Sequence, residues 1–206
     1  MTRGSSLLVG FLGMVLAGMG LVTFAGCGGS PAKAPTAYGS YNSPGGTFAC
    51  EYPEGWKADG GGKRGLEWAK FKSGSSEIRV DTGVAGSLMG DIAGTLGGKT
   101  GEEELGPEFE PVHDVHIAGK DWAEREYSGY KEAGEPAVLE ASVGPARRSE
   151  FTASSTFGGG LHGYRSTMLG HDKAVTVICI CPESDWKTLQ PAFDHVLSTF
   201  KKGQAE

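Results

Sequence analysis

The clearest pattern of hydrophobic and polar positions lies near the C-terminus, where large apolar side chains recur with an α-helical period. Ser184 is expected to cap this helix, and Asp185 suits its first turn. Pro191 is expected to kink the helix or to begin a second segment. The predicted apolar stripe consists of Trp186, Leu189, Phe193, Val196, Leu197 and Phe200.

Alternating apolar and polar residues predict β-strands along much of the remaining chain. Strands are expected at 47–52, 66–71 and 77–82, and the sequence SGSS at 73–76 is a hairpin turn between the last two. Three further strands are separated by polar or glycine-rich turns, and this spacing predicts an antiparallel meander. They are expected at 148–153, 162–169 and 174–181.

The middle of the chain carries weaker patterns. Residues 112–117 and 122–130 look like two strands that are joined at Gly119. Ser87 is placed to cap a short helix at 86–96, although glycines weaken that helix.

The first 26 residues have the layout of an export signal. Arg3 is the only charged residue before Lys33, and the run 7–25 is apolar or small almost throughout. The alternative is a single membrane-spanning helix, which needs about 20 apolar residues. Five glycines between Gly10 and Gly26 weaken that alternative.

The end of this run, Phe24-Ala25-Gly26-Cys27, resembles the lipobox of bacterial lipoproteins. The resemblance implies that Cys27 becomes the mature N-terminus and carries acyl chains, and two or more chains give stable anchoring. In bacteria with two membranes, the absence of Asp after this cysteine favours the outer membrane. An uncleaved anchor and a plain secreted protein are the alternatives.

Residues 28–46 consist mostly of Gly, Ser, Pro and Ala. Such a stretch cannot bury a core and is expected to be a flexible tether. The remainder, about 160 residues, suits one domain. The predicted organisation is a signal peptide at 1–26, a lipidated Cys27 with its tether at 27–46, a domain at 47–202 and a disordered tail at 203–206.

Acidic residues outnumber basic ones by 25 to 19, which gives a formal net charge of −6. Removal of Arg3 with the signal takes the mature chain to −7, that is −6 − 1. An acidic chain without a basic cluster in its sequence is a poor candidate for nucleic-acid binding. Membrane attachment is therefore expected to come from lipid.

Three segments, taken in order, resemble the PsbP-like family, whose fold the Ran-binding protein Mog shares. They are TFACEYPEGW at 47–56, IAGKDWAEREY at 117–127 and CPESDWKTLQPAFDHVLSTF at 181–200. The resemblance implies an α+β fold in which helices pack on both faces of an antiparallel sheet, as an α/β/α sandwich. It implies no catalytic set, because the family's roles are mostly binding and assembly, and bacterial members are often exported lipoproteins.

Three cysteines remain besides Cys27, so an exported chain has room for one disulfide and one spare thiol. Cys179 and Cys181 lie two apart on a predicted strand, where their Cα atoms would be about 6.6 Å apart, near the outer limit for a bridge. Cys50 with either of them is the better disulfide. The alternative is three buried thiols that act as small hydrophobes.

Two kinds of glycine-rich stretch invite a nucleotide-binding interpretation. The stretch AGTLGGKT at 93–100 fits a loose phosphate-loop pattern, but no strand is expected before it and three glutamates follow it, so we expect no nucleotide binding. Two matches to the dinucleotide pattern, at 60–65 and 158–163, precede strand-like sequence and are expected to be flexible hairpin connections. Within the first, Lys63 and Arg64 are placed for a small exposed anion contact.

The sequence HDVH contains His113, Asp114 and His116, but on a strand the two histidines would face opposite sides. Cys179 and Cys181 would make a zinc or copper site conceivable, although nothing in the sequence brings these segments together. No metal ligand, cofactor or activated nucleophile is therefore predicted.

Other side chains have structural explanations. On the strand at 162–169, Arg165 points away from His162 and Tyr164 and is expected to be a surface charge. A turn at 53–55 directs the following tryptophan back toward the domain. The four tryptophans, Trp56, Trp68, Trp122 and Trp186, are expected to anchor the core or cover its rim.

Together these patterns predict a lipid-anchored envelope protein that binds or assembles with an unknown protein or envelope component and performs no catalysis. The main alternative is a thiol- or metal-dependent redox protein that uses Cys50, Cys179 and Cys181. A third hypothesis is an envelope hydrolase with an unrecognised site.

Overall fold

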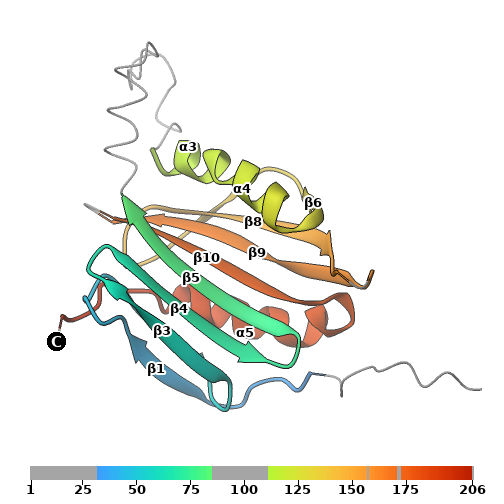
Figure 1. Cartoon of the computed structure of the whole chain (residues 1–206), viewed down its shortest axis with the longest axis horizontal. Helices are drawn as coiled ribbons and strands as arrows, with labels where there is room; N and C mark the ends of the chain where they lie inside the picture. The colour runs from blue at the N-terminus through green and yellow to red at the C-terminus, as the bar shows by residue number, and fades with distance from the viewer. Residues whose placement is uncertain (1–31, 85–110, 157, 171–172, 206) are drawn as a thin grey trace, which may run out of the picture.

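An eight-stranded antiparallel sheet forms the middle layer of the fold (Figure 1). A computed structural model describes residues 32–84, 111–156, 158–170 and 173–205. The strands are β3 (Lys57–Lys63), β4 (Leu66–Ser73), β5 (Ser76–Val84), β6 (Ser128–Glu132), β7 (Ala137–Leu139), β8 (Ala146–Ser154), β9 (Gly160–Leu169) and β10 (Lys173–Pro182). Their order is β3-β4-β5-β10-β9-β8-β6, and β7 also pairs with β8. The predicted β4–β5 hairpin and the meander of the last three strands are confirmed.

A separate two-stranded sheet contains β1 (Tyr38–Asn42) and β2 (Ala49–Pro53). Tyr41 of β1 packs against Phe48 and Phe71, with ring centroids 5.9 and 5.3 Å apart. The flexible tether predicted for 27–46 is therefore wrong at β1. The tyrosines of this stretch, which small residues surround, give it the apolar contacts that order a strand.

The C-terminal tail, which was expected to be disordered at 203–206, is tied to β1 as far as the structure describes it. The side-chain amide of Asn42 donates a hydrogen bond to the carbonyl of Gln204 (2.6 Å), and the amide of Gln204 donates to Asn42 Oδ1 (2.9 Å). Just before it, Lys201 and Ala49 exchange two backbone hydrogen bonds of 2.8 and 2.9 Å. The prediction of disorder is therefore wrong for the segment around Gln204.

One face of the main sheet is covered by α5 (Trp186–Ser198), which follows one 3₁₀ turn, η1 (Glu183–Asp185). All six side chains of the predicted apolar stripe are buried. The helix continues through Pro191, whose exposed position lets water replace the missing backbone hydrogen bond. Asp185 and not Ser184 is the residue before the helix, and its side chain makes no capping hydrogen bond, so the predicted cap is wrong.

The opposite face carries two short helices, α3 (Pro111–Ala118) and α4 (Lys120–Glu126) (Figure 1). The strands predicted at 112–117 and 122–130 are therefore wrong, except where β6 begins at Ser128. Val112 and His116 lie four residues apart and are both buried on the side of the sheet. That spacing suits a helix, and the alternation of apolar and polar residues in the same segment hid it.

The central strand β10 is buried on both faces. Val177 and Cys179 belong to the larger core, which α5 closes. The alternate residues Ile178 and Ile180 belong to a smaller core beneath α4. Successive side chains of a strand point to opposite faces, so the continuous apolar run of this strand reflects a cover on both sides.

The packing of α5 predicts that substitutions on its buried side and on its exposed side affect stability differently. Phe193→Ala should lower the free energy of unfolding by about 3–5 kcal/mol, because it removes a fully buried ring. Pro191→Ala, at an exposed position of the same helix, should not lower it, because Ala is favoured over Pro in a helix interior by up to about 3 kcal/mol. Urea denaturation measures both, and equal destabilisation by the two substitutions would contradict the orientation of α5.

Candidate functional site

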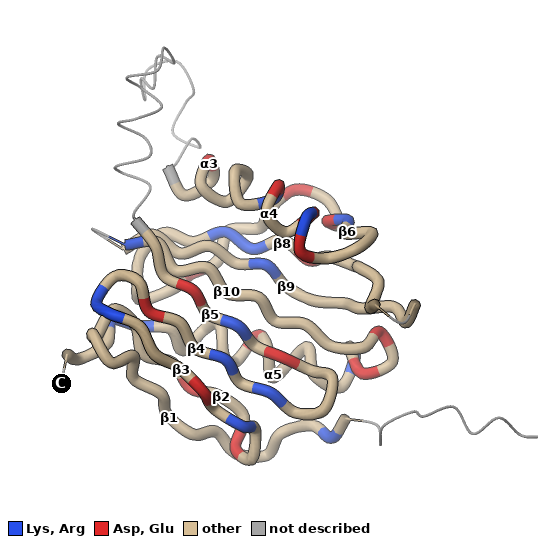
Figure 2. The backbone as a smooth tube through the Cα atoms, viewed as in Figure 1, with Lys and Arg blue, Asp and Glu red and all other residues tan. Residues whose placement is uncertain are grey.

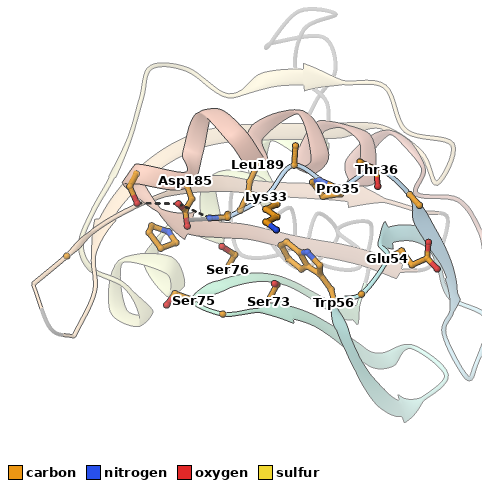
Figure 3. Close-up of a pocket in the computed structure, with 18 residues that line it drawn as sticks. Lys33, Pro35, Thr36, Glu54, Trp56, Ser73, Ser75, Ser76, Asp185 and Leu189 are labelled. Atoms are coloured by element: carbon orange, nitrogen blue, oxygen red, sulfur yellow. Dashed lines mark hydrogen bonds between the residues drawn. The ribbon is translucent and has the colours of Figure 1, made fainter. Parts of the chain in front are cut away.

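A groove with a volume of about 1200 Å³ opens at one end of the fold (Figure 3). Its walls come from the segment 32–37 before β1, the turn at 54–56, the β4–β5 hairpin at 73–76 and the junction of β10 with η1. Leu189 of α5 also lines it. Segments that are far apart in the sequence therefore meet at this end of the molecule.

Hydrogen bonds hold the segment 32–37 along the groove. The amide of Ala32 donates to Asp185 Oδ1 at 3.4 Å. At the other end of the segment, the amide of Glu54 donates to the carbonyl of Ala37 at 2.9 Å. Part of the stretch that was predicted to be a tether is thus a wall of the groove.

The groove lining combines one large aromatic ring with hydroxyl groups and a few charges. Trp56 packs edge-on against Phe193 of α5, with ring centroids 6.4 Å apart, and Figure 3 shows Lys33 directed toward Trp56. No histidine or cysteine occurs among the described residues that line the groove. The other polar side chains are those of Thr36, Glu54, Ser73, Ser75, Ser76, Ser184 and Asp185.

A histidine near this end, His162 of β9, has both ring nitrogens engaged. Its Nδ1 lies 3.0 Å from Glu183 Oε2, and its Nε2 lies 2.8 Å from Glu150 Oε1. The ring stacks on Trp186, with centroids 3.9 Å apart and planes 6° apart. Neither nitrogen is left to activate a nucleophile or to bind a metal.

His116 of α3 is buried where this helix meets the sheet. Its Nδ1 lies 3.0 Å from Thr167 Oγ1, and its Nε2 lies 2.9 Å from Ser149 Oγ. Burial lowers the pKa of His116 to about 3, and the nearby Arg165 guanidinium acts in the same direction. The ring is therefore neutral at physiological pH and links α3 to β8 and β9.

The metal site considered from the sequence is not assembled. His113, Asp114 and His116 lie on α3, whereas Cys179 and Cys181 lie in the core on the α5 side of the sheet. In the part of the chain that the structure describes, no three His, Cys, Asp or Glu side chains converge on one metal position. The sheet itself separates the two halves of that hypothetical ligand set.

Arg165 of β9 is buried, with 1% of its side chain exposed, so the expectation of a surface charge is wrong. Its Nε and Nη2 donate to Glu132 Oε1 at 2.8 and 2.6 Å, and Nη1 donates to the carbonyl of His116. The hydroxyl of Tyr130 donates to the same Glu132 oxygen at 2.6 Å. Burial alone would raise the pKa of Glu132, but the hydrogen bonds from Tyr130 and Arg165 lower it.

Cys50, Cys179 and Cys181 are buried free thiols. Burial raises the pKa of Cys50 and Cys181 to about 12, and it raises the pKa of Cys179 well above its ordinary value. The thiolate is the reactive form, so this environment disfavours thiol chemistry at all three positions.

The glycine-rich matches belong largely to strands. A Cβ at Gly60 of β3 would collide with the hydroxyl group of Tyr41, so glycine permits the close approach of β1. The flexible connection predicted at 60–65 is therefore wrong except at the tight turn, where Gly65 has a φ of 82°. The second match, at 158–163, runs into β9.

Several predictions concern residues outside the described ranges. They are the export signal at 1–26, the lipidation site Cys27, the helix at 86–96 and the phosphate-loop match at 93–100. Within the described ranges, no helix has both the length and the apolar character needed to cross a membrane.

An antiparallel sheet with helices on both faces is the PsbP-like α+β fold, and comparison with solved structures confirms this class. The solution structure of cyanobacterial PsbP (CyanoP) from Synechocystis is similar over 87% of this chain and 98% of its own, with a TM-score of 0.53 and 16% sequence identity. LpqN of Mycobacterium tuberculosis, which is involved in cell envelope biogenesis, is similar over 82% of this chain and 92% of its own, with a TM-score of 0.47 and 10% identity. No protein-family model and no curated protein sequence matches the chain. Likeness at this level of identity shows the fold and does not define the ligand.

The groove was not predicted from the sequence, because its walls are short loops without a periodic pattern. One local feature of the sequence pointed to the groove, namely the turn at 53–55 that is expected to direct Trp56 toward the domain. The contact of the Trp56 ring with Phe193 confirms that expectation.

The buried histidine predicts a pH-dependent stability. Unfolded His116 binds a proton below a pKa of about 6.5, whereas the folded side chain binds it only near 3. The contribution of neutral His116 to the free energy of unfolding is present above pH ~6.5 and is lost as the pH falls toward 3. The loss reaches about 2 kcal/mol by pH 5. Urea denaturation between pH 7 and pH 5 measures the slope. His116→Gln should remove this slope, and an unchanged slope in that variant would contradict the role of His116.

Proposed function

We propose that the chain is a lipid-anchored protein of the bacterial cell envelope, and that it binds an extended segment of a partner protein in the groove. The position of the groove supports this most. One of its walls, residues 32–37, begins five residues after Cys27. Five residues span at most about 18 Å, so an acylated Cys27 would hold the groove near the membrane surface.

The composition and size of the groove favour a polypeptide ligand. Its volume of about 1200 Å³ exceeds the roughly 300–1,000 Å³ that is usual for sites of small molecules. Backbone and hydroxyl groups of the β4–β5 hairpin provide hydrogen-bonding partners, and Trp56 provides an apolar surface. Such a combination suits an extended segment that carries at least one large apolar side chain.

The proposed role includes no catalytic step. His116 and His162, two of the five histidines, have both ring nitrogens engaged, and the three core thiols are buried. The net charge of −6 argues against a nucleic acid as the partner. These observations favour a binding or assembly role over the redox and hydrolase hypotheses.

Lipid anchoring makes a prediction about Cys27. Cys27→Ser should move the protein from the membrane fraction to the soluble fraction, because the acyl chains lose their attachment point. Cell fractionation and immunoblotting measure this, and Cys181→Ala, which also removes one thiol, should leave the distribution unchanged. Membrane attachment that persists in Cys27→Ser would contradict lipid anchoring and would favour an uncleaved helix.

Binding in the groove makes a separate prediction. A photo-crosslinking amino acid at Ser75, in the groove wall, should capture one partner in intact membranes. The same group at Ser198, which is exposed at the end of α5 and lies outside the groove lining, should not. Ser73→Arg places a large charged side chain in the groove and should reduce the Ser75 crosslink roughly 10-fold. Equal crosslinking from both positions, or a crosslink that Ser73→Arg leaves unchanged, would contradict binding of the partner in the groove.

A further inference from the structure

A second pocket, with a volume of about 440 Å³, lies at the other end of the main sheet. Strand β10 begins at Lys173, which lines this pocket, and ends at Pro182, which lines the groove. Nine residue steps of about 3.3 Å place the two sites about 30 Å apart. The pocket is therefore a site of its own and not an extension of the groove.

Three basic side chains from separate parts of the chain converge in this pocket. Arg64 lies in the β3–β4 turn, Lys173 opens β10 and Lys202 follows α5. Figure 2 shows basic positions of these three segments on the same side of the molecule. In the sequence the three residues are 109 (173 − 64) and 29 (202 − 173) positions apart, which is why no basic cluster is visible there.

The backbone around the pocket positions Lys173 and Lys202. Gly65 has a φ of 82° in the tight β3–β4 turn, and a Cβ at this position would lie 2.6 Å from Lys173 Nζ. The lysine ammonium group therefore lies directly against the turn. The backbone pairing of Lys201 with Ala49 holds the neighbouring Lys202 at the pocket.

These cations have no ion-pair partner within the described ranges. On β4, by contrast, Lys70 and Lys72 both contact Glu77 of β5, at 3.5 and 3.1 Å. These three cations lie together in one pocket although the chain carries a net charge of −6. Like charges repel at short range, so their convergence favours the binding of an anion between them.

A nearby carboxylate, that of Glu67, is satisfied by other groups. The backbone amides of Gly45 and Gly65 donate hydrogen bonds to it. Burial would raise the pKa of Glu67, but hydrogen bonds from Thr47, Ser43 and these amides lower it. Glu67 thus stays ionised with its own donors, and the three cations of the pocket remain available for a ligand.

We propose that this pocket binds a ligand that carries a phosphate group. Against a phosphate dianion the three cations leave one positive charge uncompensated, whereas against a single carboxylate they leave two. Arg64 is suited to bind two phosphate oxygens at once, Lys173 and Lys202 supply point charges, and the Ser142 hydroxyl adds a neutral donor. The volume leaves room for a substituent on the phosphate, so the ligand is a phosphomonoester, either a soluble one or a lipid headgroup.

Isothermal titration of the full-length protein tests this inference, with inorganic phosphate and glycerol phosphate as probes and acetate at equal ionic strength as the control. Both phosphate probes should bind saturably, one per chain, and acetate should not. Arg64→Gln and Lys173→Gln should each weaken binding about 10-fold, because each removes a charge-assisted contact. The matched control is Lys57→Gln, which changes the net charge equally at the other end of β3 and lies outside the pocket lining, and it should leave the affinity unchanged.

A short-chain phosphatidic acid, used below its micelle concentration, distinguishes the two sources of the ligand. Binding that is much tighter than that of glycerol phosphate assigns a lipid headgroup, whereas equal binding assigns a soluble phosphomonoester. Thermal unfolding confirms that each variant is folded. Absence of saturable binding by every phosphate probe, acetate binding of equal strength, or equal losses in Lys57→Gln and Arg64→Gln would overturn the proposal.

Discussion

Water has to be excluded from both faces of β10 at once, and this constraint decides where the other elements lie. Val177 and Cys179 point into the core that α5 closes, while Ile178 and Ile180 point into the core beneath α4. Each such large apolar side chain contributes about 1.5–3 kcal/mol when it is fully buried, so a cover on one face alone would forfeit a row of these contributions. The chain supplies the two covers from segments on either side of β6 to β10, with α3 and α4 before them and α5 after them.

The cover of α3 and α4 also removes polar strand residues from water, and these must then find partners inside the protein. Arg165 shares Glu132 with Tyr130 and donates to the carbonyl of His116, which itself contacts two hydroxyl groups. An unpaired buried charge costs about 3–5 kcal/mol, so α3 and α4 can cover this face only because the network gives the buried charges partners. Residues that look reactive in the sequence are therefore explained by packing, and the same holds for the buried thiols on the other face.

The sequence allowed prediction only where burial leaves a local pattern. The stripe of α5 and the apolar run of β10 are such patterns, and both were predicted. α3 and α4 have eight and seven residues, too few for a helical period to stand out against alternation, and the sheet beneath them decides the burial of Val112. β3 was missed because its glycines carry no pattern, although Gly60 is required by the approach of β1. For the second pocket, the sequence indicated an anion contact at Lys63 and Arg64, and of these two only Arg64 is in the pocket lining. Lys173 could not be predicted there, because the pairing of distant strands brings it beside the β3–β4 turn.

Both candidate binding sites lie at strand ends, and each uses a terminal segment of the domain as part of its wall. The segments 32–37 and 201–205 contain few large apolar residues, so in the sequence they resemble a tether and a tail. Hydrogen bonds order them instead. Residues 32–37 are bonded to Asp185 and Glu54, and the pairs of Lys201 with Ala49 and Gln204 with Asn42 tie the second segment to the small β1–β2 sheet. The sequences of such loops and terminal segments can vary without disturbing a sheet that is covered on both faces. A fold shared with CyanoP at 16% identity is therefore compatible with a different ligand, because the residues that would select the ligand lie where the sheet imposes least constraint.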